Sequence, residues 1–136
     1  MTKMIFINLP VKDLAASERF YTALGFTKNE QFSDDNAISM VWSDAITFML
    51  LKHEYFLTFT KKPLANAREK VGALFAISLD SREAVDAITE MAGKSGGKAD
   101  VQDKQDLGFM YSRTFEDPDG HVFEPAYMDM SAMPEG

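Results

Sequence analysis

The sequence predicts an α+β fold of two strand–helix–three-strand (βαβββ) modules, with curved mixed sheets paired around a central cavity and the helices outside. Two observations predict it. A strand, a capped amphipathic helix and three short strands follow one another over residues 4–52, and the same order returns over residues 73–128. Each sheet would keep one bare face, so pairing those faces would enclose a shared cavity. The repeat lies in the order of elements rather than in residue identity.

The first module opens with a strand and a helix. Residues 4–9 are rich in Ile and Phe and predict a buried strand, which Pro10 ends. Asp13 is a candidate N-cap of the helix, and Gly25 is its C-terminal stop. The apolar residues between them share one helical face: Leu14, Phe20, Tyr21 and Leu24. Three strands follow, at about 26–32, 37–43 and 45–52.

The second module follows a connector at about 53–71. Residues 73–79 predict an apolar strand, and Asp80 begins a pattern that resembles a capping box. The buried face of the next helix is predicted to hold Ala84, Val85, Ile88 and Met91. Strands at about 98–105, 108–116 and 121–128 complete the module, the last after an Asp-Pro-Asp-Gly turn. We therefore expect one domain over residues 1–136, with modules at about 1–52 and 72–130.

The start of the connector is rich in aromatic residues. Residues 54–59 include Tyr55, Phe56 and Phe59. They could form a lid, contribute to a dimer contact, or simply cover one end of the cavity, and the sequence leaves all three open.

Composition excludes several classes of function. The formal net charge of −7 argues against nucleic acid or an anionic membrane as partner, because both favour clustered Lys and Arg. The chain has no cysteine, which excludes a disulfide, a thiolate metal site and a cysteine nucleophile. No apolar run reaches membrane-spanning length, and the first ten residues do not resemble a signal peptide. We expect a cytoplasmic protein.

Glu124 is the residue of the last strand that invites a functional interpretation. Alternation along a strand places it on one face with Val122, Ala126 and Met128, whereas His121 points to the opposite face. A carboxylate among apolar side chains costs free energy unless it is paired, protonated or bound to a metal. A functional carboxylate and one that is hydrogen-bonded to a neighbour both fit this pattern.

Two segments resemble the vicinal oxygen chelate superfamily, which includes glyoxalase I, bleomycin-resistance proteins, extradiol dioxygenases and fosfomycin-resistance enzymes. They are NLPVKDLAASERFYTALGF at 8–26 and EDPDGHVFEP at 116–125. The resemblance implies the fold of paired modules, and it implies a homodimer. Metal-binding members carry four ligands on strands inside the cavity. By resemblance these positions are Glu124, Phe6, Leu74, and Phe48 or Met49.

Three of the four ligand positions are therefore occupied by residues that do not bind hard or borderline metals. Divalent ions need about three or more N or O donors from the protein. We expect no cofactor and no divalent metal. The cavity would then be an apolar pocket with few polar groups. Its predicted lining residues are Phe6, Asn8, Met40, Trp42, Phe48, Leu74, Tyr111 and Arg113.

Three functions compete on these grounds. The first, which we favour, is a protein that binds a small, partly apolar molecule without metal. The second is a lyase- or dioxygenase-type enzyme with Glu124 as its catalytic general base, helped by Arg113, Asn8 or backbone amides. The third is a structural or regulatory module whose cavity is filled by its own side chains.

Overall fold

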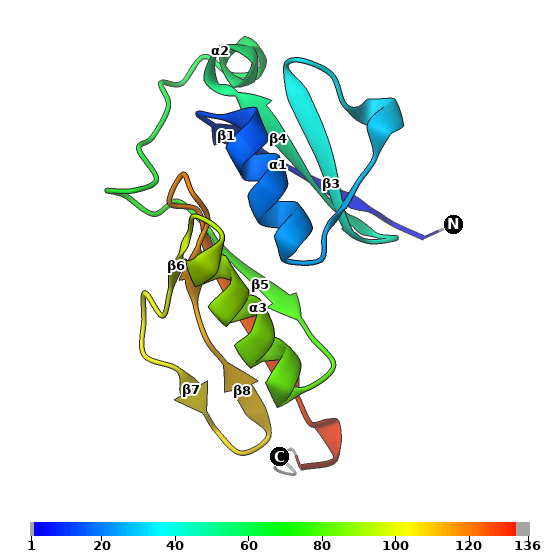
Figure 1. Cartoon of the computed structure of the whole chain (residues 1–136), viewed down its shortest axis with the longest axis vertical. Coiled ribbons are helices and arrows are strands. Elements are labelled where there is room, and N and C mark those ends of the chain that lie inside the picture. The colour runs from blue at the N-terminus through cyan, green and yellow to red at the C-terminus, as the bar shows by residue number, and fades with distance from the viewer. Residues whose placement is uncertain (1, 133–136) are drawn as a thin grey trace. The chain divides into compact units, whose positions relative to one another are not determined.

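The computed structural model describes residues 2–132, and the chain divides into two compact units, Met1–Asn66 and Ala67–Gly136 (Figure 1). Residues 1 and 133–136 of the predicted domain lie outside the described residues. Each unit contains one curved mixed sheet, so the predicted α+β class and the two βαβββ modules are confirmed. The shared cavity between the modules stays a prediction.

The first unit has a four-stranded sheet in the order β1-β4-β3-β2. β1 runs parallel to β4, and the other pairs are antiparallel. The elements are β1 (Ile5–Val11), α1 (Leu14–Ala23), β2 (Thr27–Lys28), a 3-10 turn (Glu30–Phe32), β3 (Ala37–Ser43), β4 (Ile46–Lys52), α2 (His53–Phe56) and a second 3-10 turn (Leu57–Phe59).

The second unit repeats this arrangement around a central strand, β10. β5 runs parallel to β10. β8 and β9 pair antiparallel with β10, each along a different part of it. The elements are β5 (Leu74–Ser78), α3 (Arg82–Lys94), β6 (Lys98–Ala99), β7 (Gln105–Asp106), β8 (Met110–Ser112), β9 (Phe115–Glu116), β10 (Val122–Met128) and a 3-10 turn (Met130–Ala132). Within residues 2–132, no helix is long and apolar enough to cross a bilayer.

Several predicted strands are shorter than expected, and local chemistry explains each one. β2 ends early because the Asn29 side chain accepts a hydrogen bond from the Gln31 N–H at 3.1 Å and caps a 3-10 turn. Strand 98–105 is split because Asp100 takes a left-handed φ of 56°. β8 and β9 are one strand interrupted at Arg113. The Arg113 N–H donates to the Pro125 carbonyl at 3.2 Å, but Pro125 has no N–H to return the bond.

One helix packs on one face of each sheet and forms the core there. In the first unit the core is aromatic: the Tyr21 ring lies 5.1 Å from both Phe20 and Phe26, edge to face. In the second unit Phe115 and Phe123 stack with centroids 5.1 Å apart. Within residues 2–132, neither α1 nor α3 covers the other face of its sheet (Figure 1).

The helix caps confirm one prediction and correct another. The Asp13 side chain accepts from the Ala16 N–H at 3.2 Å, so Asp13 caps α1 as expected. The cap of α3 is Ser81, whose hydroxyl accepts from the Ala84 N–H at 3.0 Å, and not Asp80. The prediction placed this cap one residue too early.

We expect Ser81→Ala to lower the free energy of unfolding by about 1 kcal/mol, because it leaves an N-terminal amide of α3 without its acceptor. Asp80→Ala is the matched control and should cost clearly less. Urea unfolding followed by far-UV circular dichroism measures both. A larger loss for Asp80→Ala than for Ser81→Ala would contradict the cap assignment.

Candidate functional site

Glu124 lies on the open face of the second unit's sheet, the face that α3 does not cover. On β10 it lies between Phe123 and Pro125, both buried in the core. Its partner in register on β5 is Ala76. The bond between Arg113 and Pro125 places Thr114 beside Glu124 on the other side. The alternation that predicts the direction of Glu124 therefore holds along this strand.

The carboxylate of Glu124 is half-buried and has no partner. No hydrogen bond or ion pair joins it to any residue in the described part of the chain. No donor within residues 2–132 therefore satisfies this carboxylate through a hydrogen bond. A half-buried acid in this state is able to bind a ligand, and its catalytic role stays a prediction.

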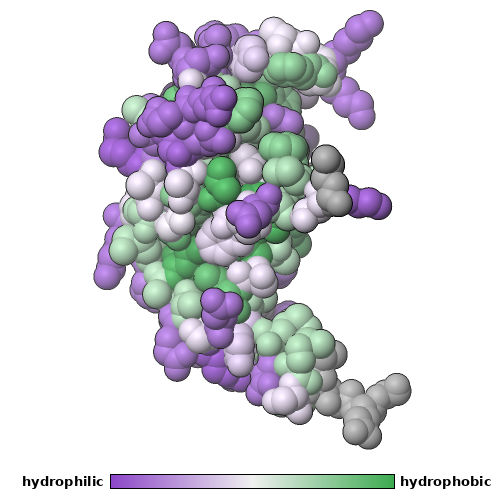
Figure 2. Space-filling view, turned by 90° about the vertical axis from the view of Figure 1, so that its right-hand side faces the viewer, coloured by the Kyte–Doolittle hydropathy of each residue, from purple (hydrophilic) through white to green (hydrophobic). Residues whose placement is uncertain are grey.

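The surroundings of Glu124 on this face are mainly apolar. Leu74 pairs with Val122 in register and is 59% exposed, and Met128 is 45% exposed. Glu116 on β9 also pairs with Val122, which brings a second carboxylate to the same face. Figure 2 shows hydrophobic side chains at the surface on one side of the molecule. The face combines apolar surface with acids.

The open face of the first unit carries Phe6 and Asn8, both exposed, with Phe6 at 56%. Their partners in register on β4 are Thr47 and Met49. This register decides between the two residues that the sequence left open: Met49 shares the face of Phe6, and Phe48 does not.

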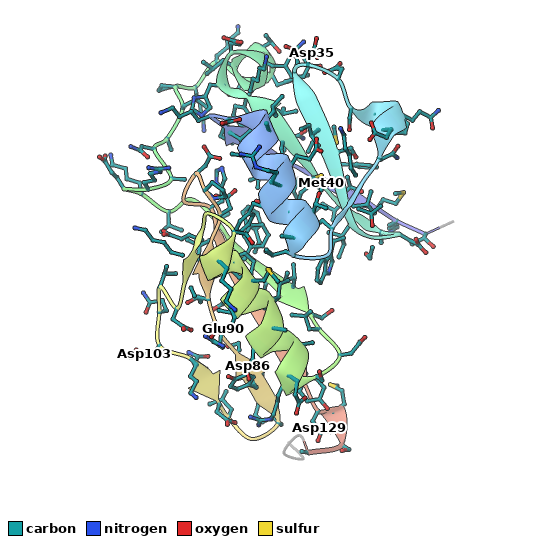
Figure 3. The ribbon with its side chains drawn as sticks, viewed as in Figure 1. Asp35, Met40, Asp86, Glu90, Asp103 and Asp129 are labelled. Carbon is teal, nitrogen blue, oxygen red and sulfur yellow. The ribbon has the colours of Figure 1, made fainter. Side chains whose placement is uncertain are left out.

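Three predicted pocket residues lie instead in the helix-covered core of the first unit. Phe48 and Met40 are almost fully buried there, and the Phe26 ring is 5.8 Å from Phe48. Trp42 lies in an irregularity of β3 and packs on Phe26 at 4.8 Å. Figure 3 shows Met40 on β3. The sequence alone does not place them, because both faces of β3 and β4 carry apolar side chains.

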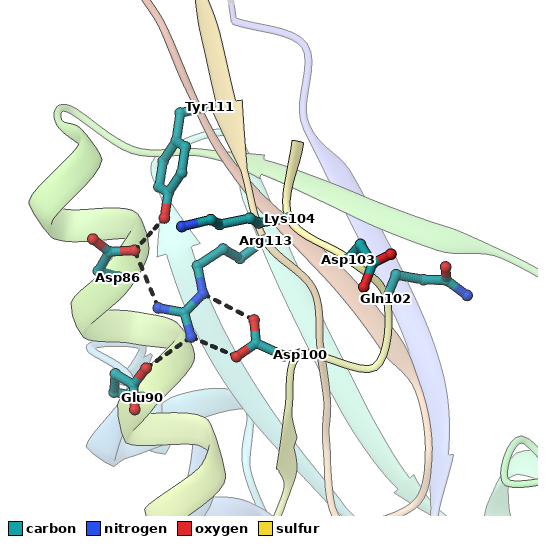
Figure 4. A pocket seen from close by; sticks show the side chains of 8 residues that line it. All are labelled: Asp86, Glu90, Asp100, Gln102, Asp103, Lys104, Tyr111 and Arg113. Carbon is teal, nitrogen blue, oxygen red and sulfur yellow. Dashed lines mark hydrogen bonds and ion pairs between the residues drawn. The ribbon is translucent and has the colours of Figure 1, made fainter. Parts of the chain in front are cut away.

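Arg113 and Tyr111, the other two predicted pocket residues, face α3 and not the side of Glu124. Arg113 is bidentate to Asp100, with Nε–Oδ1 at 2.9 Å and Nη2–Oδ2 at 2.7 Å. It also donates to Glu90 at 2.7 Å and to Asp86 at 3.1 Å. The Tyr111 hydroxyl donates to the same Asp86 oxygen at 2.6 Å (Figure 4). An open recess of about 570 Å³ adjoins the cluster.

Charge pairing perturbs the acids and bases of this cluster. The Tyr111 hydroxyl and then Arg113 lower the pKa of Asp86 below its usual value. Arg113 likewise lowers the pKa of Asp100. The hydrogen bond to Asp86 raises the pKa of Tyr111, and the pKa of Arg113 is raised mainly by Asp100. The Arg113 guanidinium forms ion pairs with three carboxylates. These pairs hold α3 and residue 100 against the sheet.

The acidic partners of Arg113 are residues that the sequence analysis missed. Asp86 and Glu90 are four apart on α3 and extend from the same side of that helix (Figure 3). This spacing is the signal that could have found them. Nothing local marks Asp100, which reaches Arg113 from a loop.

The turn before His121 is held by backbone hydrogen bonds to the Asp117 side chain. The Asp117 carboxylate accepts from the backbone N–H groups of Asp119 at 2.9 Å and His121 at 2.8 Å. Asp117 is buried and closes the turn that leads into β10. This turn fixes where β10 begins, and so fixes the direction of Glu124.

The positions that the resemblance assigns to metal ligands offer few donors. Of the four positions that the resemblance assigns to ligands, only Glu124 offers a hard donor, while Phe6, Met49 and Leu74 do not. Within residues 2–132, no three His, Asp or Glu side chains lie close enough together to hold a metal. One carboxylate does not supply the donors that such an ion needs.

Comparison with known proteins gives a family. The sequence model of the Glyoxalase/Bleomycin resistance protein/Dioxygenase superfamily matches residues 3–124. None of the curated proteins matches the chain significantly. Hypothetical protein SA1046 from S. aureus is 28% identical with a TM-score of 0.78, covering 93% of this chain and 95% of that chain.

Two more distant solved structures share the fold. A glyoxalase/bleomycin resistance protein/dioxygenase family enzyme from Burkholderia phytofirmans PsJN is 18% identical, with a TM-score of 0.75 over 93% of this chain and 99% of that chain. The fosfomycin resistance protein FosX from Mesorhizobium loti is 17% identical, with a TM-score of 0.68 over 96% of each chain. The motifs, the two βαβββ modules and the match over residues 3–124 agree, and this chain belongs to the glyoxalase/bleomycin resistance protein/dioxygenase superfamily.

Proposed function

We propose that this chain binds a small, partly apolar molecule without a metal ion, on the open sheet face that carries Glu124. One observation carries the proposal: a half-buried carboxylate without a partner stands among exposed apolar side chains. Small-molecule sites combine apolar walls with a few polar groups that orient the ligand. Apolar surface that a ligand removes from water contributes roughly 25 cal/mol of favourable free energy per Å².

The binding function is favoured over the enzymatic alternative by the position of Arg113. A general base at Glu124 needs a nearby group that stabilises the negative charge developing on the substrate. Arg113 was the cationic candidate, but it faces α3 and its donors are taken by Asp86, Glu90 and Asp100. The homodimer implied by the family stays a prediction, and the unpaired outer edges of β1 and β5 among the described strands are compatible with it.

A thermal-shift screen of small aromatic, dicarbonyl and antibiotic compounds, with and without Zn²⁺, Ni²⁺ and Mn²⁺, tests this function. We expect at least one compound to raise the melting temperature in the absence of added metal. A ligand at a hundred times its Kd stabilises by about 2.7 kcal/mol, which corresponds to several degrees. Metal ions alone should have no effect. Stoichiometric metal that is lost on Glu124→Ala would contradict the proposal.

Two exposed leucines of the second unit provide a matched pair for locating the site. Leu74→Ser removes apolar surface next to Glu124 and should weaken the compounds found, whereas Leu107→Ser should not. Leu74 is 59% and Leu107 56% exposed, so the folding cost of the two changes is similar. Equal effects of both variants on binding would place the ligand elsewhere.

A further inference from the structure

The open face of the second unit's sheet ends in two methionines that pair across strands. Met128 is the last residue of β10, and its partner in register on β8 is Met110. The next pair along these strands is Tyr127 with Tyr111, and the Tyr111 hydroxyl donates a hydrogen bond to α3. Successive side chains of a strand point to opposite faces, so both methionines lie on the face of Glu124.

Met128 is accessible to small molecules in solution, because it is 45% exposed. Met110 is half-buried beside it. The sulfur of a methionine is soft and polarizable, and oxidants convert it to a sulfoxide at a rate that follows its exposure. The chain has no cysteine, so no thiol of this protein competes for the oxidant. Exposed methionines are therefore the side chains through which a mild oxidant acts on this protein.

Oxidation of Met128 changes the chemistry of the face on which binding is proposed. Methionine is a flexible apolar side chain, whereas its sulfoxide is polar and carries a strong hydrogen-bond acceptor. The neighbours of Met128 on this face, Ala126 and Met110, have no donor in their side chains. A ligand that covers the sulfoxide would remove its water and leave the oxygen without a donor, which is unfavourable. The oxidised face should therefore bind an apolar molecule more weakly.

We propose that Met128 is a site of reversible oxidation by a peroxide, and that this oxidation regulates binding on the open face of the second unit. This inference rests on the proposed binding function and adds its regulation. A lone pair of Sδ attacks one oxygen of hydrogen peroxide, so that an S–O bond forms and the O–O bond breaks. The departing hydroxide takes the proton of the transferred oxygen and leaves as water. The sulfur loses two electrons and the peroxide gains them.

The reverse reaction needs a thiol reductant. A methionine sulfoxide reductase transfers two electrons from a pair of thiols to the sulfoxide, which yields methionine, a disulfide and water. The change at Met128 is therefore a switch between an apolar and a polar side chain at one end of the binding face.

Peptide mapping by mass spectrometry, after brief treatment of the full chain with hydrogen peroxide, tests whether Met128 reacts. Met128 and Met91 are 45% and 40% exposed, so their rates should agree within about threefold. Met40 is fully buried and should stay reduced over the same time.

The effect on binding is measured by NMR titration of the ¹⁵N-labelled full chain with 2-phenylethanol, a neutral probe of apolar surface. We expect the Kd from the β10 amides to rise about fivefold or more on oxidation, the effect of leaving one acceptor without a donor. Methionine sulfoxide reductases of both stereospecificities, with dithiothreitol, should restore the original Kd. The same ratio is measured for each compound that the thermal-shift screen finds.

Met128→Leu and Met91→Leu form the matched pair of variants. Both remove one exposed thioether from the second unit and keep an apolar side chain of similar volume, but Met91 lies on α3, which covers the opposite face. Peroxide should change the Kd of Met128→Leu by less than about twofold, whereas Met91→Leu should still lose about fivefold or more. Met128→Gln, which is polar without oxidation, should weaken the probe before any peroxide is added. Hydrogen exchange of α3 verifies that all three variants are folded.

The outcomes distinguish this inference from the function on which it rests. If the oxidised and reduced chains bind equally well, or if Met128→Leu loses affinity with peroxide as the wild type does, regulation through Met128 is wrong and the binding function stands. If Met91 is oxidised while Met128 stays reduced, regulation is wrong in the same way. If neither 2-phenylethanol nor any compound of the screen binds the reduced chain, the proposed function fails, and its regulation fails with it.

Discussion

Gly120→Ala is expected to destabilise the second unit by about 2–4 kcal/mol. Gly120 has a φ of 95°, which side chains with a Cβ rarely adopt. A Cβ at this position would lie 2.8 Å from the backbone nitrogen of Arg68 and 2.9 Å from the carbonyl carbon of Ala67. These are backbone atoms, so relief requires that the chain at 67–68 move away from the turn. That movement would also break the 2.6 Å bond from the Arg68 guanidinium to the Pro118 carbonyl.

Gly108→Ala is the control, since it separates backbone strain from the close approach. Gly108 belongs to the same unit and has a φ of 81°, but a Cβ there would meet nothing within 4 Å. Gly108→Ala should therefore lower the free energy of unfolding by only about 1 kcal/mol, because alanine is less stable than glycine in the left-handed conformation. Urea unfolding by circular dichroism, with hydrogen exchange of α3 to report on this unit, measures both. Equal losses for the two variants would show that residues 67–68 do not pack tightly on the turn.

The order of the elements was predictable because local patterns determine it. The periodicity of apolar residues gave α1 and α3, and the Asp-Pro-Asp-Gly turn gave the start of β10. What local patterns do not contain is pairing across strands. That Pro125 interrupts the facing strand at Arg113 follows only from a register between residues twelve positions apart, which the sequence does not display.

The same limit applies to the candidate site. Glu124 could be assigned a face because successive side chains of a strand point to opposite sides, which groups it with Val122, Ala126 and Met128. β4 is apolar on both faces, at Phe48 and at Met49 alike, so its direction could be settled only by the pairing with β1. Arg113 appeared to be a free cation for a pocket because its three acidic partners lie 13 to 27 positions away in the chain.

Arg113→Met is expected to lower the free energy of unfolding by about 2–3 kcal/mol at pH 7. Methionine keeps most of the buried apolar stem, but three carboxylates then face one another without their cation. The value lies below that for fully buried pairs because these carboxylates are exposed by 49% at Asp86, 58% at Glu90 and 48% at Asp100, and can recover water. The Arg113 side chain itself is only 10% exposed.

Acid should remove the difference between wild type and Arg113→Met. Arg113 lowers the folded-state pKa of Asp86 and Asp100, and a carboxyl with a lowered folded pKa stabilises the fold above its unfolded value, near 4. This stabilisation is lost as the pH falls through the folded values. In urea unfolding, the difference in free energy of unfolding between wild type and Arg113→Met should therefore be constant between pH 5 and 8. It should become smaller below about pH 4.

Arg82→Met is the matched control for the same charge change at the surface. Arg82 pairs with Asp106 at 2.8 Å and lowers the pKa of that carboxyl to about 2, but its side chain is 38% exposed. Solvent screens such a pair, so the loss should be smaller than for Arg113→Met. An equal loss for the two variants, or a gap for Arg113→Met that is undiminished at pH 3, would contradict the role given to the ion pairs of Arg113. The apolar face of α3, with Val85 and Ile88 buried, would then supply most of what holds this helix to the sheet.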